Sequence, residues 1–433
     1  MNNCYEEKWL ALKEEIDRRG ADGGAVVAAL RDYYSIFEDR LPEWLGSLYN
    51  PEIGGFHFSI SSRDNDTVTT PAGTFPLLPD IESTFQTMSM IKDSLMIESY
   101  DELPDKMREK IKSFVCSLQD EETGFIYHPH WRMLMQDGFG KDANADRIWR
   151  SRRGRDTMWA NGMCQKFNFS LPYPTAYERL NSGEVQKENA EPIMPEYLLS
   201  REAFLEHLNS LDWENDSYYA GNMVAGQIKL IIAAGHADTL IDFLNEKQNK
   251  ETGFWGKKEG YAAINGFLKT TAAYTETGRL IPNADKAAKS IFKCATTSEA
   301  ALTVCYQYNV WFSLLNIINC LKAAGGEEGC AEAEKVSLTL LKNCAEAIRA
   351  TKEKALAFKR EDGSFSTYTY GSASHSQGMP VAIEGSVEGD VNGANICTTG
   401  TVKRMFEVLG LADFYIPLYS PDAFKKFLKA AKM

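Results

Sequence analysis

The chain has 433 residues, of which 44% are hydrophobic and 25% charged, and its formal net charge is −13. Such a negative charge excludes a general nucleic-acid-binding role, because phosphates attract basic surfaces. No apolar run approaches the roughly 18 residues of a membrane span, and the first residues lack the segments of a secretory signal. We therefore predict a cytoplasmic protein without a membrane partner.

The first 49 residues predict a pair of amphipathic helices. Tyr5, Trp9, Leu12 and Ile16 fall on one helical face, and a second apolar stretch runs from Ala25 to Leu48. No linker rich in Pro, Gly or Ser follows, so we expect one domain over residues 1–433. The nine cysteines form no Cys-x-x-Cys pair and are interpreted as reduced structural thiols. No metal or other cofactor is expected.

Four short segments combine glycine with a following aromatic residue, and each predicts the end of a helix. They are residues 50–56, 119–125, 248–255 and 361–365. Glycine supplies the left-handed conformation that stops a helix, and the aromatic side chain can pack back onto the helix just ended.

Six polar or small-residue clusters each precede an apolar, helix-like stretch, and they form an imperfect internal repeat. They are residues 79–84, 159–163, 219–223, 263–267, 307–311 and 390–394. Five contain an asparagine, and these asparagines step by 61, 43, 44 and 83 residues: Asn161, Asn222, Asn265, Asn309 and Asn392. Periods of this length in a helical chain indicate repeated helix pairs.

The order of glutamine, glycine turn and aromatic residue resembles the Gln-to-Trp repeat of the squalene cyclase and prenyltransferase superfamily. Residues 248–255 match best and residues 119–125 match well, whereas the other two turns lack the leading glutamine. The resemblance implies an all-α (α/α)6 toroid, a barrel of six helical hairpins with short irregular or β rim loops. Six-hairpin glycosidases and the toroidal domain of polysaccharide lyases have the same shape. The six polar clusters would then meet at one end of the barrel, around the active centre.

Residues 127–156 lack helical periodicity and predict a rim loop over that end. The candidate ligand-binding residues here are His128, His130, Trp131, Arg152, Arg153, Arg155 and Asp156. Guanidinium groups bind carboxylates and phosphates in a bidentate manner, so an acidic or polyhydroxylated ligand fits this segment. The alternative is that the arginines form a solvated face and the histidines only pack the loop.

Residues 366–392 predict a second rim loop, which carries His375, Glu388, Asp390 and Asn392 to the last of the polar clusters. Asp80 and Glu82 lie at the first cluster, so a closed barrel would place carboxylates from both ends of the chain side by side. Two opposed carboxylates are what glycoside hydrolysis requires. The alternative is that Asp80 caps a helix and that both acids interact with its dipole. An extended piece, residues 56–64, adds His57 and Arg63 to the rim.

Amides, phenols and nearby tryptophans such as Trp255 are typical of sugar sites. The main hypothesis is therefore an enzyme, a glycoside hydrolase or polysaccharide lyase, acting on an acidic oligosaccharide. A hydrolase would oppose Asp80 or Glu82 to Glu388 or Asp390. A lyase would neutralise the uronate with asparagine or arginine and use a tyrosine or histidine base; the candidates are Asn222, Asn265, Arg153, Tyr218 and His128.

Two alternatives remain open. An isoprenoid cyclase or prenyltransferase-like enzyme shares the expected shape, although the chain has neither Asp-x-Asp-Asp nor Asp-Asp-x-x-Asp. A non-catalytic ligand-binding toroid would use the asparagines only to join neighbouring helices.

Overall fold

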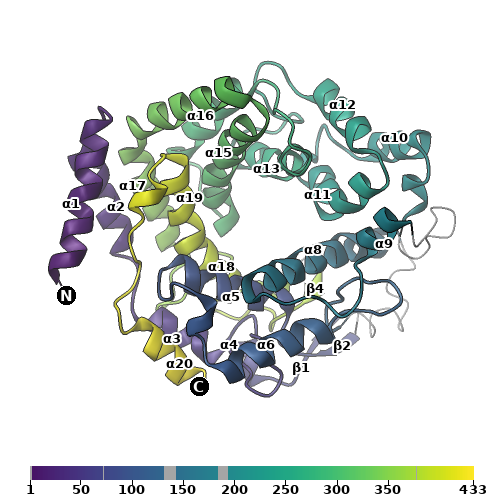
Figure 1. The fold of residues 1–433 in the computed structure, drawn as a ribbon, viewed down its shortest axis with the longest axis horizontal. Helices are drawn as coiled ribbons and strands as arrows, with labels where there is room; N and C mark the ends of the chain where they lie inside the picture. The colour runs from purple at the N-terminus through teal and green to yellow at the C-terminus, as the bar shows by residue number, and fades with distance from the viewer. Residues whose placement is uncertain (1, 72, 131–142, 184–193, 377) are drawn as a thin grey trace.

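The protein is mainly helical, as predicted (Figure 1). The computed structural model describes residues 2–71, 73–130, 143–183, 194–376 and 378–433. Helices account for 61% of the chain. Within the described ranges, the strands form two antiparallel hairpins, β1 (Thr67–Thr70) with β2 (Gly73–Pro76) and β3 (His375–Ser376) with β4 (Met379–Pro380). No helix in these ranges is long and apolar enough to cross a membrane.

Six helical segments, the central helices, contact one another in chain order. They are α5 (Ile81–Asp93), α8 (Ala143–Phe167), α11 (Ser217–Ala233), α13 (Gly260–Thr277), α15 (Val304–Ala324) and a last segment, in which a π-helical turn (Ile396–Gly400) joins α18 (Val391–Asn395) to α19 (Thr401–Val408). Each contacts the next, and the last segment also contacts α5. Figure 1 shows them in this order around the middle of the molecule.

The remaining helices, the outer helices, lie before, between and after the central ones in the sequence, and several of them pack on the central helices. They are α1 (Asn2–Arg18), α2 (Gly23–Tyr34), α3 (Arg40–Ser47), α4 (Ile60–Asp64), α6 (Asp105–Ser117), α9 (Ala176–Ser182), α10 (Arg201–Ser210), α12 (Ala237–Lys247), α14 (Ala284–Ala295), α16 (Gly326–Leu341), α17 (Cys344–Leu356) and α20 (Ala423–Ala430). Helix α14 packs on α15, α6 on α8 and α12 on α13. The first 49 residues form three helices and not the predicted pair, because residues 35–39 interrupt the second stretch.

The four glycine–aromatic turns end helices α3, α6, α12 and α17, as predicted. Their glycines have positive φ values, 92° at Gly54, 72° at Gly124, 74° at Gly253 and 85° at Gly363. An isolated antiparallel bridge spans each turn, for example between Gln248 and Trp255. These turns direct the chain from each outer helix back toward a central one.

Trp255 is a structural residue, so its predicted role in substrate binding is wrong. Its ring is fully buried, and its Nε1 donates a hydrogen bond of 2.8 Å to the carbonyl of Leu244 on the preceding helix α12. Gln248 secures the same turn by donating to the carbonyls of Gly253 (2.9 Å) and Pro282 (2.7 Å). The side chain therefore packs back onto the helix just ended.

A glycine beside the repeated asparagine brings neighbouring elements into close contact. A Cβ atom on Gly266 would lie 2.2 Å from Ser217 Oγ on α11, and one on Gly221 would lie 2.8 Å from Thr270 Oγ1 on α13. On α18, a Cβ atom on Gly393 would lie 2.3 Å from the carbonyl carbon of Ser366. Each of these repeat units therefore supplies a glycine that allows close packing and an asparagine with a polar side chain.

Residues 143–156 are helical, which corrects the predicted rim loop over residues 127–156. Helix α8 begins at Ala143, so Arg152, Arg153, Arg155 and Asp156 lie on its surface and not on a loop. Arginine is a good helix former, and the glycine in this run is compatible with a helix that is packed closely. A Cβ atom on Gly154 would lie 1.9 Å from the carbonyl oxygen of Gly226 on α11.

We predict that Gly393→Ala lowers the free energy of unfolding by about 1–3 kcal/mol, because the new methyl group meets backbone atoms that cannot move aside. Urea denaturation measures the change. The control is Gly24→Ala on α2, where a Cβ atom would meet only Asp22 Oδ1, at 3.3 Å. That change should raise stability by up to about 1 kcal/mol through helix propensity. Equal effects of the two substitutions would contradict the close contact at Gly393.

Candidate functional site

A cavity of about 780 Å³ lies among the central helices and is lined by all six of them. We call it the central cavity. Each central helix contributes two lining residues spaced four apart, which places them on one helical face. These pairs are Glu82 and Gln86, Arg155 and Trp159, Tyr218 and Asn222, Asn265 and Lys269, Cys305 and Asn309, and Asn392 and Ile396.

Capped helix starts position most of these pairs. The side chains of Asp80, Asp216 and Asp390 accept hydrogen bonds from the first-turn amides of α5, α11 and α18, at 2.9, 3.3 and 2.7 Å. Thr303 caps α15 in the same way. The lining pairs of these four helices therefore lie in their first two turns. On α13 the pair extends to Lys269, near the middle of the helix, and on α8 it lies at the middle of the helix and one turn beyond. The alternative interpretation of Asp80 as a helix cap is confirmed.

The repeated asparagines line the central cavity and also join neighbouring helices. Asn309 Nδ2 donates to Asn265 Oδ1 at 2.7 Å, and Asn222 Oδ1 accepts from Arg155 at 2.7 Å. Asn392 Nδ2 donates to Thr367 Oγ1 at 3.0 Å. These amides therefore join neighbouring segments, as the structural interpretation predicted, and also face a cavity.

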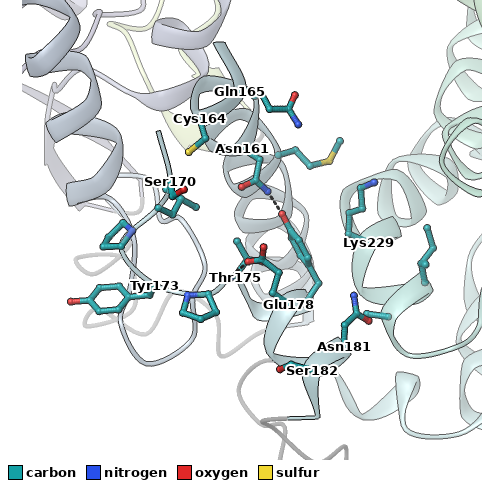
Figure 2. A pocket seen from close by; sticks show the side chains of 18 of the residues that line it. Asn161, Cys164, Gln165, Ser170, Tyr173, Thr175, Glu178, Asn181, Ser182 and Lys229 are labelled. Carbon is teal, nitrogen blue, oxygen red and sulfur yellow. Dashed lines mark hydrogen bonds between the residues drawn. The ribbon is translucent and has the colours of Figure 1, made fainter. Parts of the chain in front are cut away.

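Asn161 is the exception among the five asparagines. It lies on the part of α8 that lines a separate cavity of about 1210 Å³, where its amide donates a hydrogen bond to Tyr177 (Figure 2). On α8 the central cavity is reached instead by Arg155 and Trp159. The cluster at residues 159–163 lies inside α8 and not at its start, so its asparagine is not equivalent in position to the other four.

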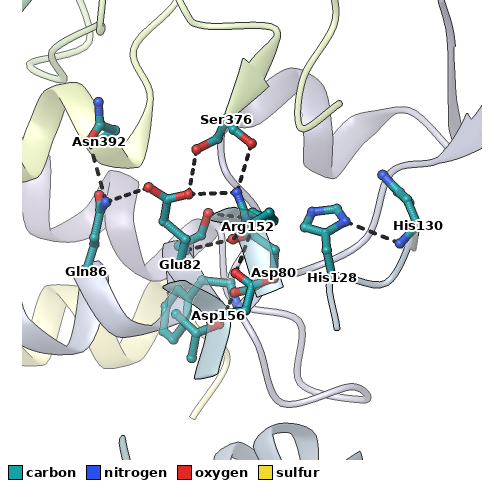
Figure 3. A network of polar contacts seen from close by, with 12 residues as sticks. Asp80, Glu82, Gln86, His128, His130, Arg152, Asp156, Ser376 and Asn392 are labelled. Atoms are coloured by element: carbon teal, nitrogen blue, oxygen red, sulfur yellow. Dashed lines mark hydrogen bonds and ion pairs between the residues drawn. The ribbon is translucent and has the colours of Figure 1, made fainter. Parts of the chain in front are cut away.

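Arg152 is buried at the centre of a cluster of carboxylates beside the cavity (Figure 3). It pairs with Asp156 at 2.8 Å, with Glu82 at 3.0 Å and with Asp80 at 3.9 Å. It also donates to the carbonyl of Ser376 at 2.8 Å, and the Ser376 hydroxyl donates to Glu82. The cluster joins α5, α8 and the segment of residues 366–392.

Burial dominates the electrostatics of this cluster. It raises the pKa of Asp156 to about 7 and that of Asp80 to about 6, although the positive charge of Arg152 opposes both shifts. Burial alone would lower the pKa of Arg152, but the three carboxylates hold it above its ordinary value. The cluster therefore retains a charged guanidinium beside acids that take up protons near neutral pH.

Two cationic side chains of the cavity have no carboxylate partner. Within the described ranges, no Asp or Glu lies at ion-pair distance from Arg155 or Lys269. Lys269 Nζ lies 5.7 Å from the centre of the Tyr218 ring. Burial, followed by the positive charge of Arg155, lowers the pKa of Lys269 to about 7. An anionic ligand would supply the charge that both groups lack.

Sequence reasoning missed Lys269. Its signal was present, because Lys269 follows Asn265 by four residues and therefore shares its helical face. Gln86 and Trp159, which follow Glu82 and Arg155 by the same step, could have been found in this way too.

The carboxylate pair predicted for a hydrolase is not assembled at the cavity. Only Glu82 of the four acids lines it. Asp390 is buried and accepts hydrogen bonds from Gly393, from the amide and hydroxyl of Thr367, and from Ala373. Glu388 accepts from the amide of Ser61 at 2.9 Å. Asp80 caps α5, so these three acids hold backbone in place and do not line the cavity where their catalytic roles were predicted.

Of the four predicted site histidines, His375 alone lines the central cavity. His128 and His130 are buried against each other with ring centres 4.6 Å apart, and His130 bonds to the carbonyl of Pro76. Burial lowers the pKa of both rings, and that of His57 to about 4. These three histidines are buried and do not line the central cavity, where the binding roles of His57 and His130 and the catalytic role of His128 were predicted.

Two predicted arginines, Arg63 and Arg153, also lie away from the cavity. Arg63 is paired with Asp64 at 2.6 Å. Arg153 is buried, with its guanidinium 4.1 Å from the centre of the Phe125 ring. Trp131 lies outside the described residues. Neither Arg63 nor Arg153 lines the central cavity, which corrects their predicted roles in ligand binding.

Comparisons of the chain with family models, with curated proteins and with solved structures find no match. In the described ranges, no three His, Cys, Asp or Glu side chains converge as ligands of a metal ion. The geometry of the central cavity is therefore the basis for assigning a function.

We predict that Asp156→Asn changes how stability depends on pH. The unfolded carboxyl titrates at about pH 3.8 and the folded one at about pH 7. The folded state therefore binds this proton more tightly, and the stabilisation that the proton provides is lost as pH rises from about 3.8 through about 7. Between these two pH values, the wild-type free energy of unfolding minus that of the variant should fall by up to about 1.4 kcal/mol per pH unit.

Urea denaturation at a series of pH values measures this difference. Asp101→Asn, at an exposed position, controls for the loss of one negative charge. A difference that stays constant between pH 4 and about 7 would contradict the raised pKa of Asp156.

Proposed function

We propose that the protein is a carbohydrate-active enzyme that binds an acidic oligosaccharide in the central cavity and cleaves it by β-elimination, as a polysaccharide lyase does. The observation that carries the proposal is the lining of this cavity. Four of the five repeated asparagines line it together with the unpaired cations Arg155 and Lys269.

We also propose that the central and outer helices together form an (α/α)6 toroid. Support comes from the contacts between successive central helices and from the contact of the last segment with α5. The helix-ending turns and the capped starts of the central helices are consistent with this arrangement. In such a barrel the polar helix starts surround one opening, which suits a chain-like substrate.

The polar groups of the cavity match a sugar. Sugar edges present hydroxyl groups, which amides and phenols can bind, and sugar faces are apolar and stack on aromatic rings. The lining supplies both kinds of group: it has amides from Asn222, Asn265 and Asn309, and aromatic rings from Trp159 and Phe312. An isoprenoid chain would leave these amides unsatisfied, at about 1–3 kcal/mol for each buried polar group.

The charges of the cavity favour a uronate and elimination over hydrolysis. A guanidinium without a carboxylate partner binds a carboxylate in a bidentate manner, and Arg155 lies in the lining. A glycoside hydrolase needs two available carboxylates. The lining carboxylates are Glu82, which pairs with Arg152, and Asp216, which caps α11 and lies 3.7 Å from Lys258. Elimination needs instead a base and a group that neutralises the uronate carboxylate.

A ligand screen tests the proposal. We expect uronic oligosaccharides, such as oligogalacturonate or oligomannuronate, to raise the melting temperature more than neutral oligosaccharides or farnesyl diphosphate. Wild-type protein should release unsaturated products that absorb in the ultraviolet. Stabilisation by diphosphates alone would favour the isoprenoid alternative, cleavage without ultraviolet absorption would favour hydrolysis, and binding without cleavage would favour a non-catalytic toroid.

We further predict that Arg155→Met weakens binding of uronic oligosaccharides by about 10- to 100-fold, the loss expected for a charge-assisted hydrogen bond. Neutral oligosaccharides should be affected much less, because they offer no carboxylate. Titration calorimetry measures both affinities. Arg279→Met, at an exposed ion pair with Asp238, is the matched control. Equal losses of affinity for uronic and neutral oligosaccharides would show that Arg155 does not bind the carboxylate.

A further inference from the structure

Lys269 occupies a position that none of the stabilising interactions of the fold explains. It lies in the middle of α13, four residues after Asn265, and its half-buried side chain lines the central cavity. Within the described ranges its Nζ forms no hydrogen bond and no ion pair, and it lies over the face of the Tyr218 ring, 5.7 Å from the ring centre. A lysine that only stabilised the fold would be expected to pair with an acid or to extend into solvent.

Burial and the neighbouring charge of Arg155 favour the uncharged form of Lys269. Arg155 on α8 repels the ammonium, whereas Cys305 on α15 and Glu82 on α5 act in the opposite direction more weakly. Glu82 is already paired with Arg152. Burial and the charge of Arg155 outweigh these two groups and lower the pKa of Lys269 to about 7. A base works best when its pKa is close to the working pH, because enough of it is then unprotonated.

Tyr218, the ring beneath Lys269, has the opposite property. It lines the same cavity and is 40% exposed. Burial raises the pKa of its phenol above the ordinary value. The hydroxyl therefore remains protonated near neutral pH, which suits a proton donor better than the base suggested by the sequence.

We propose that Lys269 is the general base of this site and that it takes the proton from the carbon next to the carboxylate of a bound uronate. The inference rests on the proposed function. The C5–H bond breaks as the neutral amine accepts the proton, and its electron pair forms the C4–C5 double bond as the C4–O bond breaks. The leaving oxygen takes a proton from Tyr218. Arg155 and Asn222 hold the carboxylate, so that charge developing on it is stabilised.

The first measurement asks whether the amine is uncharged near neutral pH, independently of any activity. The full chain is treated with trinitrobenzenesulfonate at a series of pH values, and modified lysines are quantified by mass spectrometry. We expect half-maximal labelling of Lys269 near pH 7, and slower labelling when oligogalacturonate is present. Lys335, which is exposed on α16, serves as the internal reference. Labelling of Lys269 only above about pH 9 would overturn the inference.

The second measurement separates a base from a structural cation. Lys269→Arg keeps the positive charge and the contact with the ring, but arginine stays protonated in proteins. Both Lys269→Arg and Lys269→Gln should lower kcat for uronate elimination by 100-fold or more, with a change of less than threefold in Kd for oligogalacturonate. Both should also abolish the exchange of the C5 proton in D2O. Lys335→Gln is the control. Rescue of kcat by arginine would show a structural role and overturn the inference.

The outcomes distinguish this inference from the proposed function. Wild-type elimination that survives in both Lys269 variants would overturn the role of Lys269 and leave the lyase assignment standing. A wild-type protein that neither binds nor cleaves uronates would overturn the proposed function and with it the base role, even if Lys269 is labelled at neutral pH.

Discussion

The site depends on one buried cation. Arg152 is only 1% exposed, and its partners come from α5, from α8 itself and from the segment of residues 366–392. Breaking a buried ion pair by removing one partner costs about 3–5 kcal/mol, since the remaining charge stays desolvated. Arg152 therefore fixes the elements that carry Glu82 and His375 into the cavity. Arg155, one turn away on α8, lies on the same helix, and its guanidinium donates a hydrogen bond to Asn222.

The central helices must pack closely against other elements and must also present polar groups to the cavity. Residues that are adjacent in the sequence meet these two requirements. Gly221, Gly266 and Gly393 allow another element to approach where a methyl group would not fit. The asparagines beside them, Asn222 and Asn265 among them, line the cavity. A helix with glycine packed against its neighbour and a polar residue facing inward can enclose a polar cavity without losing its own packing.

Features of the fold and of the candidate site that depend on residues close together in the sequence could be predicted, whereas features that depend on contacts between distant segments could not. Turns at Gly124 and Gly253 and the cap at Asp80 depend on local backbone geometry, so their residue types predicted them. The asparagine repeat marked the cavity because four of its members face inward. The arginines of residues 147–155 were predicted to lie on a loop. They lie on a helix, which is packed through contacts between distant segments, such as Gly154 against Gly226. Trp255, Asp390 and His128 have residue types typical of sites, and only tertiary packing shows that they are buried supports.

The amides of the cavity are already oriented before a ligand arrives. Asn265 accepts a hydrogen bond from Asn309, and Asn222 accepts one from Arg155. An amide has both an acceptor and a donor group, so each bond fixes the side chain while leaving half of its capacity unused. In the described part of the chain, Asn265 Nδ2 and Asn222 Nδ2 remain available as donors, and Asn309 Oδ1 as an acceptor. A ligand that binds these groups loses little side-chain entropy, because the helices already restrict the rotamers. Fixed geometry and free polar groups, the two properties that the proposed sugar site requires, therefore arise from the same asparagines that join the helices.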